Sequence, residues 1–88
     1  MSWNKFSEKK PLKNDDYLTV TVSKYGNNIH KFYAIYSWAN NLMKETCSYD
    51  FEGMEEYNHG GFYGHDSEWG DYEVTNITAW KEIEDYEV

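Results

Sequence analysis

The sequence contains no arginine and only one cysteine and one proline among its 88 residues. Without arginine it lacks the planar side chain best suited to binding phosphates and guanine edges. The single Cys47 cannot form an internal disulfide. It occupies an apolar position of the alternating stretch "TCSYDF", which predicts a small buried side chain rather than a nucleophile. The sequence has no run of the roughly 20 apolar residues that are needed to span a membrane. No apolar run follows the N-terminal lysines, as one would in a signal peptide. We therefore expect a cytoplasmic protein without membrane contact.

Aliphatic residues are also scarce, and nine Tyr, four Trp and four Phe take their place. Each aromatic ring buries roughly 150–250 Å², so we expect most rings to build the core of a single domain spanning residues 1–88. A domain of this size cannot cover every ring, because its surface is large relative to its volume. An exposed cluster of rings would be a natural contact surface for a partner.

Charge is distributed unevenly along the chain, whose net charge is −8. Residues 1–31 carry six Lys against three acids, whereas residues 45–88 carry thirteen acids against Lys81 alone. From Glu45 to Glu73 there are nine acids and no Lys. A surface of one sign repels nucleic acid and attracts basic partners. The sequence therefore predicts a partner protein with a basic surface and no direct binding of nucleic acid.

Alternating apolar and polar residues predict an α+β, β-dominated domain with little helix. We expect a four-stranded antiparallel sheet, with strands at residues 17–23, 29–38, 46–52 and 72–80. The stretch "KYGNN" between the first two is typical of a hairpin turn. Residues 29–38 carry apolar side chains on both faces, which predicts a central strand covered on both sides at least in part.

An acidic insertion at about residues 40–71 separates the second strand from the last. Five of the six glycines lie within residues 53–71, and this part shows no sustained period. We expect a long irregular loop with a short pairing at "GFYG". Loops of this length are usually functional or mobile.

Four polar residues of this loop, His59, His65, Asp66 and Glu68, are of the types that bind divalent metals. Their spacing matches no metal motif, and a glycine-rich loop does not hold ligands in place. We therefore expect solvated side chains, with no metal and no cofactor. The chain also lacks nucleotide-binding and catalytic motifs, so we expect no enzyme activity.

Both ends of the chain carry a short tryptophan motif. "WNKFSEKKP" has seven residues between Trp3 and Pro11, and "ITAWKEI" places Trp80 after Ile77 and Thr78. The sequence resembles a small domain of unknown function, common in phages and prophages, that opens with W-I-S-V-x-x-x-L-P and closes with V-T-H-W-M-P-L-P. Ala79 replaces the family's His, and an acidic tail replaces its Pro-rich ending.

The resemblance implies an accessory protein of a phage or mobile element, located in the cytoplasm of the host cell. It assigns no activity. It gives the tryptophans a structural role, in which Trp3 and Trp80 close the core from the two chain ends and Trp38 lies between them.

The acidic segment suggests how such a protein could act. Exposed carboxylates can mimic the phosphates of a nucleic acid and occupy a basic groove, while aromatic rings anchor the contact. We expect a non-enzymatic inhibitor, anti-CRISPR-like, that binds a host defence protein such as a CRISPR effector nuclease. The predicted contact residues are Asp50, Glu52, Glu55, Glu56, Tyr57, Tyr63, Asp66, Glu68, Trp69 and Asp71.

Two alternatives stay open on the sequence. The first is a small binding module that uses exposed aromatics for a host protein or small molecule, with charge incidental. The second is a metal-dependent accessory protein using residues 59–68. Salt separates acidic mimicry from aromatic docking, because only the former weakens steeply with ionic strength. The sequence is compatible with a monomer or a homodimer.

Overall fold

The structure, a computed structural model, describes residues 3–46, 54–68 and 70–84. Its centre is a long antiparallel hairpin of β2 (Asp15–Tyr25) and β3 (Asn28–Ala39). Tyr25 pairs with Asn28, so the turn consists of Gly26 and its neighbour, and Gly26 has a φ of 60°. Glycine adopts this left-handed backbone without a steric penalty. The first two predicted strands and the turn between them are confirmed.

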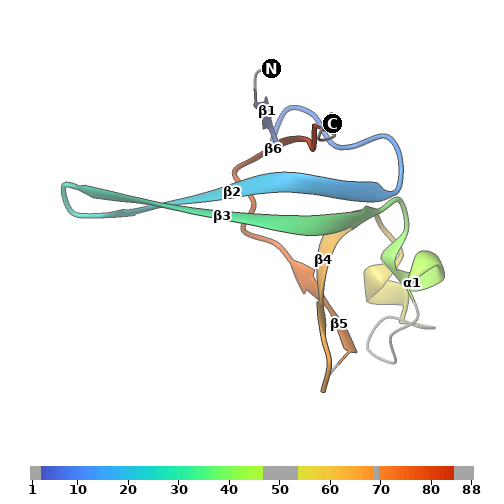
Figure 1. Cartoon of the computed structure of the whole chain (residues 1–88). Coiled ribbons are helices and arrows are strands. Elements are labelled where there is room, and N and C mark those ends of the chain that lie inside the picture. Colours follow the sequence, from blue (N-terminus) through green and yellow to red (C-terminus); the bar gives the residue numbers. More distant parts are fainter. Residues whose placement is uncertain (1–2, 47–53, 69, 85–88) are drawn as a thin grey trace, which may run out of the picture.

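The hairpin forms the middle of a six-stranded sheet, in the order β1-β6-β2-β3-β4-β5, in which every pairing is antiparallel (Figure 1). The outer strands are β1 (Asn4–Lys5), β6 (Ala79–Glu82), β4 (Gly61–Asp66) and β5 (Gly70–Val74). Two short helices, α1 (Leu42–Glu45) and η1 (Glu55–Tyr57), complete the described elements. The β-dominated class is confirmed, but the sheet has six strands where four were expected. Across the described ranges, neither helix has the length or apolarity to cross a membrane.

The last predicted strand, residues 72–80, is two separate strands. Its first part belongs to β5, which pairs with β4, and its second part belongs to β6, which pairs with β2. Between them the chain crosses one face of the sheet, and Ile77 is buried there. One continuous strand cannot pair at two separated positions of the same sheet, so residues 75–78 leave the sheet.

The glycine-rich segment is more regular than expected. It contains η1, and the pairing predicted at residues 61–64 is part of β4, which joins the edge of β3. Of the predicted strand at 46–52, only Thr46 is described; it follows α1, and its hydroxyl donates to the Leu42 carbonyl at 2.6 Å. The rest of that strand, including Cys47, lies outside the described residues.

Two clusters lie on opposite faces of the sheet. The larger consists of Tyr17, Trp38, Phe62, Ile77 and Trp80. The smaller consists of Ala39 and Leu42, with Tyr57 and Tyr63 packed against them. Trp38 and Ala39 are neighbours in β3, and successive strand residues point to opposite faces. The short helices α1 and η1 therefore cover the second face only near the end of β3.

The tryptophan prediction is confirmed for Trp38 and Trp80 and is wrong for Trp3. Trp3 is 36% exposed, and its ring centroid lies 6.1 Å from that of Tyr33. The Lys81 ammonium lies 4.8 Å from the Trp3 ring centroid. Asn4 pairs with Trp80 on the core face, so alternation turns Trp3 toward the opposite face. Phe6 packs against the core cluster instead.

Part of the central hairpin extends beyond the other strands. The β6 strand pairs with β2 over residues 17–20, and β4 pairs with β3 over residues 37–39. Residues 21–33, here called the arm, form a two-stranded ribbon that projects from the body (Figure 1). β3 is a central strand as predicted, and its cover is partial, since in the arm Phe32 is 59% and Tyr33 55% exposed.

Candidate protein-interaction surfaces

The acids of segment 45–73 that the structure describes gather around α1, η1 and the β4–β5 hairpin, at the end of the molecule away from the arm tip (Figure 1). We call this set the acidic end. Its members are Glu45, Glu55, Glu56, Asp66, Glu68, Asp71 and Glu73. The two glutamates of η1 are exposed and begin a 3₁₀-helix of three residues.

The β4–β5 hairpin brings three predicted contact residues together. Asp66 pairs with Gly70 and His65 pairs with Asp71, so Asp66, Glu68 and Asp71 lie at the same end of the hairpin. The Asp66 carboxylate accepts a hydrogen bond from the Glu68 backbone N–H at 2.8 Å, and the Asp71 carboxylate lies 2.9 Å from His65 Nδ1. Backbone pairing thus holds these carboxylates at one end of the hairpin, where Asp66 and Glu68 are exposed and Asp71 is mostly covered.

Acids from three elements surround the Tyr63 hydroxyl. Burial raises the pKa of Tyr63, a hydrogen bond with Ser37 lowers it, and the charges of Asp71, Asp16 and Glu45 raise it further. The net shift is upward, because burial and negative charge both disfavour the phenolate. Asp16, on β2, therefore faces the same region as the acids of β5 and α1.

The raised pKa values of Tyr63 and Tyr17 predict a loss of stability in alkali. Burial is the main cause at Tyr17, and the charges of Asp15 and Glu82 add to it. Because the tyrosine pKa values are raised in the folded state, the free energy of unfolding does not depend on these groups below the unfolded-state pKa of 10.0. It falls as pH rises above that pKa, since the unfolded chain then loses the phenolic protons more easily. We expect the urea midpoint to fall above about pH 10, and to fall less in Tyr63→Phe. An equal fall of the urea midpoint with pH in the wild type and in Tyr63→Phe would contradict this.

Two predicted aromatic contacts are engaged within the protein. Tyr57 and Tyr63 are half-buried and pack against Ala39 and Leu42, so they join η1 and β4 to the second core cluster. Of the other predicted contact residues, Glu55 and Glu56 are exposed on η1, whereas Asp50, Glu52 and Trp69 lie outside the described residues.

The predicted contact residues did not include Glu45 and Glu73 of the acidic end, or Asp16, whose charge acts on Tyr63 beside it. Asp16 is far from the acidic segment in sequence and reaches Tyr63 only through the pairing of β2, β3 and β4. The Glu73 Oε2 atom lies 3.7 Å from the His59 Nε2 atom.

Within the described ranges, no three His, Cys, Asp or Glu side chains are grouped to hold a metal.

Two pockets lie beside the start of β2. Leu18, Ile35 and Ile83 line the apolar pocket, together with Lys81, Glu82 and Glu84. The second, here called the polar pocket, is lined by Lys13, Asp15, Asp16, Tyr17, Glu82 and Ile83. Leu18 and Tyr17 are neighbours in β2 and point to opposite faces of the sheet.

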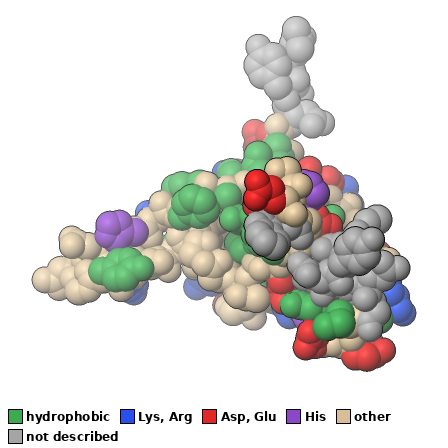
Figure 2. Space-filling view, turned by 90° about the horizontal axis from the view of Figure 1, so that it is seen from below, with side chains coloured by type: hydrophobic (Ala, Val, Ile, Leu, Met, Phe, Trp, Pro, Cys, Tyr) green, Lys and Arg blue, Asp and Glu red, His purple; other side chains and the backbone are tan. Residues whose placement is uncertain are grey.

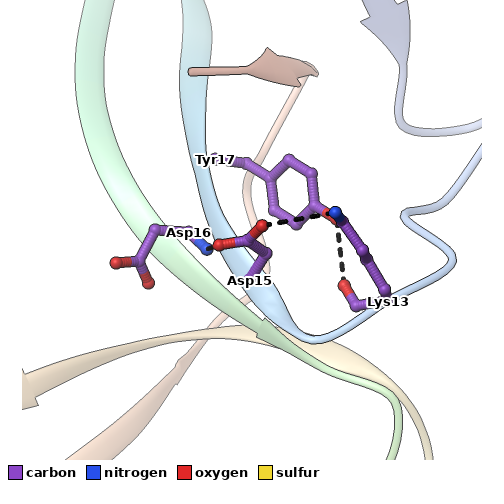
Figure 3. Close-up of polar contacts among 4 residues, drawn as sticks. All are labelled: Lys13, Asp15, Asp16 and Tyr17. Atoms are coloured by element: carbon purple, nitrogen blue, oxygen red, sulfur yellow. Dashed lines mark hydrogen bonds and ion pairs between the residues drawn. The ribbon is translucent and has the colours of Figure 1, made fainter. Parts of the chain in front are cut away.

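Local hydrogen bonds order the polar pocket (Figure 3). The Tyr17 hydroxyl donates to the Lys13 carbonyl at 2.9 Å, and the Asp16 backbone N–H donates to the Asp15 carboxylate at 2.8 Å. The Lys13 ammonium lies 3.7 Å from Asp15, but both side chains are mostly exposed, so this ion pair contributes little to stability. Asp16 and Glu82 also line this pocket.

Comparison of the chain with protein-family models, with curated proteins and with solved structures finds no match. The resemblance to the phage domain therefore stays a prediction from short sequence motifs. Function is inferred below from the two surfaces of this chain.

Proposed function

We propose that the protein is a non-enzymatic binding protein that contacts a basic partner protein through its acidic end. The single observation that carries this proposal is the convergence of carboxylates from β2, α1 and β5 around Tyr63. Acids that lie far apart in the sequence meet in space, so their fields add over one region of the surface.

The partner that suits this surface best is a protein that normally binds nucleic acid. Carboxylates at strand ends and on η1 present negative charge at intervals, as a phosphate backbone does, and electrostatic steering makes such binding fast. The phage-like motifs make a host defence nuclease, such as a CRISPR effector, the first class to test. The protein would act by occupying the groove that the nucleic acid uses.

Reversing Glu55 and Glu56 to Lys tests this proposal. Both side chains are exposed, so the fold should be retained. We expect the E55K/E56K variant to lose at least tenfold in its inhibition of DNA cleavage by a purified CRISPR effector nuclease, since rim charges set the rate of association. The same assay at rising salt should show the wild type weakening.

The matched control is E8K/E84K, which changes net charge equally at exposed positions outside the acidic end. It should inhibit nearly as well as the wild type. Equal losses in both variants would show that only total charge matters. Inhibition that survives E55K/E56K would reject the acidic end as the contact.

A second candidate function is docking through exposed apolar side chains. The observation that favours it is their concentration on the central hairpin, where Tyr25, Ile29, Phe32, Tyr33 and Ile35 are each more than half exposed. These side chains lie on the hairpin and not on the acidic end. The two surfaces are therefore separate.

A further inference from the structure

One edge of the central hairpin has no strand beside it over most of its length. The β4 strand pairs with β3 only at residues 37–39, and among the described residues no strand pairs with the same side of β3 over residues 28–36. The β4–β5 hairpin turns away from β3, and the arm projects alone from the body (Figures 1 and 2). We call residues 28–36 the open edge of β3.

The backbone groups of this edge point away from the hairpin. On the other strand, the Val20 carbonyl and the Val22 N–H both bond to Thr78, so these residues direct their backbone groups away from β3. In an antiparallel ladder, both members of such a pair direct these groups outward, and every second residue does the same. The corresponding residues of the open edge are the partners of Lys24, Val22, Val20 and Leu18, namely Ile29, Lys31, Tyr33 and Ile35.

The opposite edge of the arm is shorter and partly closed. The β6 strand pairs with β2 as far as Val20, and the Thr78 hydroxyl accepts the Val22 N–H at 3.0 Å. Of the residues of β2 that direct their backbone groups outward, Lys24 alone lies beyond these contacts. An unpaired strand edge is a template for another strand, and the longer the free edge the better the template. The open edge of β3 is therefore the edge that favours strand addition.

We propose that the open edge pairs with the open edge of a second copy of the chain, antiparallel, with a two-fold axis at Phe32. Phe32 is the middle residue of 28–36, so this axis uses the whole open edge of both copies. Ile29 then pairs with residue 35 of the second copy, and Lys31 pairs with residue 33. All the outward N–H groups meet outward carbonyls. The contact is isologous and joins the two sheets into one.

The side chains of the open edge select this axis. Lys31 faces a tyrosine, Ile29 faces a β-branched residue and Phe32 faces a second ring, which are pairs that stabilise antiparallel strands. An axis at Lys31 would set two lysines directly opposite each other, which is destabilising. An axis at Tyr33 would set Ile29 opposite Ser37, whose outer edge β4 already occupies. The axis at Phe32 avoids both conflicts.

The pairing also stabilises the arm. A two-stranded ribbon is only marginally stable by itself, and a third and fourth strand remove that weakness. Exposed apolar side chains at residues 29, 32, 33 and 35, each more than half exposed, gain neighbours in the second copy. The inference goes beyond the proposed function, because none of its pairs involves the acidic end.

Sedimentation velocity of the full chain tests the proposal. We expect the mass to rise from 10.5 kDa toward twice that value between about 0.1 and 1 mM, because one strand edge is a small interface. The association constant should rise with salt, since each copy carries a net charge of −8 and salt screens the repulsion between them. Binding of a basic partner by the acidic end weakens with salt, so the two contacts are distinguishable.

Proline substitutions separate the two edges of the arm. Lys31→Pro removes an N–H of the open edge that the hairpin does not use, so the hairpin is retained while the second copy loses a bond. We expect its association constant to fall at least tenfold. Lys24→Pro is the matched control, since it removes the same charge and an outward N–H from the opposite edge. It should associate as the wild type does.

Replacing Phe32 by Cys tests the position of the axis. Residues that face each other in a non-hydrogen-bonded pair have Cβ atoms about 4.5–5.5 Å apart, which a small adjustment brings within reach of a disulfide. We expect F32C/C47S to form a covalent dimer with oxidised glutathione. The control T21C/C47S places its thiol on the same face but on the other strand, opposite residue 32, and should stay largely monomeric. The cross-link decides the proposal even where the proline variant fails to fold.

Three results would overturn the proposal. One is a wild-type chain that keeps the mass of one copy up to about 1 mM, a concentration that populates even weak complexes; a monomer whose open edge binds only a foreign extended peptide belongs here. Another is a dimer that folded Lys31→Pro leaves intact or that Lys24→Pro weakens equally. The third is cross-linking of T21C/C47S as readily as of F32C/C47S. None of these results depends on nuclease inhibition.

Discussion

Replacing Phe62 by Ala is expected to unfold most of the protein at 37 °C. Phe62 is fully buried, and its ring lies 5.1 Å from Trp38, 5.5 Å from Phe6 and 6.3 Å from Tyr17, centroid to centroid. Deleting a buried Phe side chain costs about 3–5 kcal/mol. A small domain has a total stability of about 5–15 kcal/mol, usually at the low end for this length.

Thermal unfolding followed by circular dichroism measures this effect, and a fall in Tm on the order of 20 °C is expected. Phe32→Ala is the matched control, since Phe32 is 59% exposed on the arm. Its free energy of unfolding should change by less than about 0.5 kcal/mol. Similar losses in the two variants would show that the rings of the core and the arm are packed alike.

Replacing Trp80 by Ala is expected to cost about as much, roughly 3–5 kcal/mol. Trp80 is 5% exposed, its ring lies 5.0 Å from Tyr17, and its indole N–H donates to the Lys9 carbonyl at 2.8 Å. The side chain therefore both fills the core and ties the N-terminal segment to β6.

Trp80→Phe separates these two contributions. It retains an aromatic ring but removes the indole N–H, so the Lys9 carbonyl loses its donor. We expect a cost well below that of Trp80→Ala, about 1 kcal/mol for the hydrogen bond plus a smaller packing loss. Urea denaturation of both variants gives the two values. Equal costs would mean that the bond to Lys9 contributes most of the effect.

The position of Trp3 shows where pattern alone fails. Its motif resembles that of Trp80, and both were expected in the core. The pairing of Asn4 with Trp80 decides otherwise, because it fixes which face each residue of β1 points to. A shift of register by one residue exchanges the two faces of a strand, and register is a property of the pairing and not of the single strand.

The acidic surface was only partly predictable for a related reason. Segment charge is visible in sequence, and the sequence indicated Glu55, Glu56, Asp66, Glu68 and Asp71 directly. Asp16 joins them only because β2 lies two strands from β4 in the sheet order. Conversely, Tyr57 and Tyr63 were expected as contact anchors, and their packing against Leu42 commits them to the fold instead.

The sequence by itself determined the β-dominated class, the β2–β3 hairpin, its glycine turn and the uneven distribution of charge. These properties depend on alternation, on the left-handed backbone of Gly26 and on composition, all of which are local. The tertiary structure decided the division of residues 72–80 into β5 and β6, the exposure of the arm and the meeting of distant acids. Those depend on which strands pair and over what length, and β6 and β4 each cover only the part of the hairpin nearest the body. Long-range pairing is set by the packing of the whole chain, and therefore no local pattern contains it.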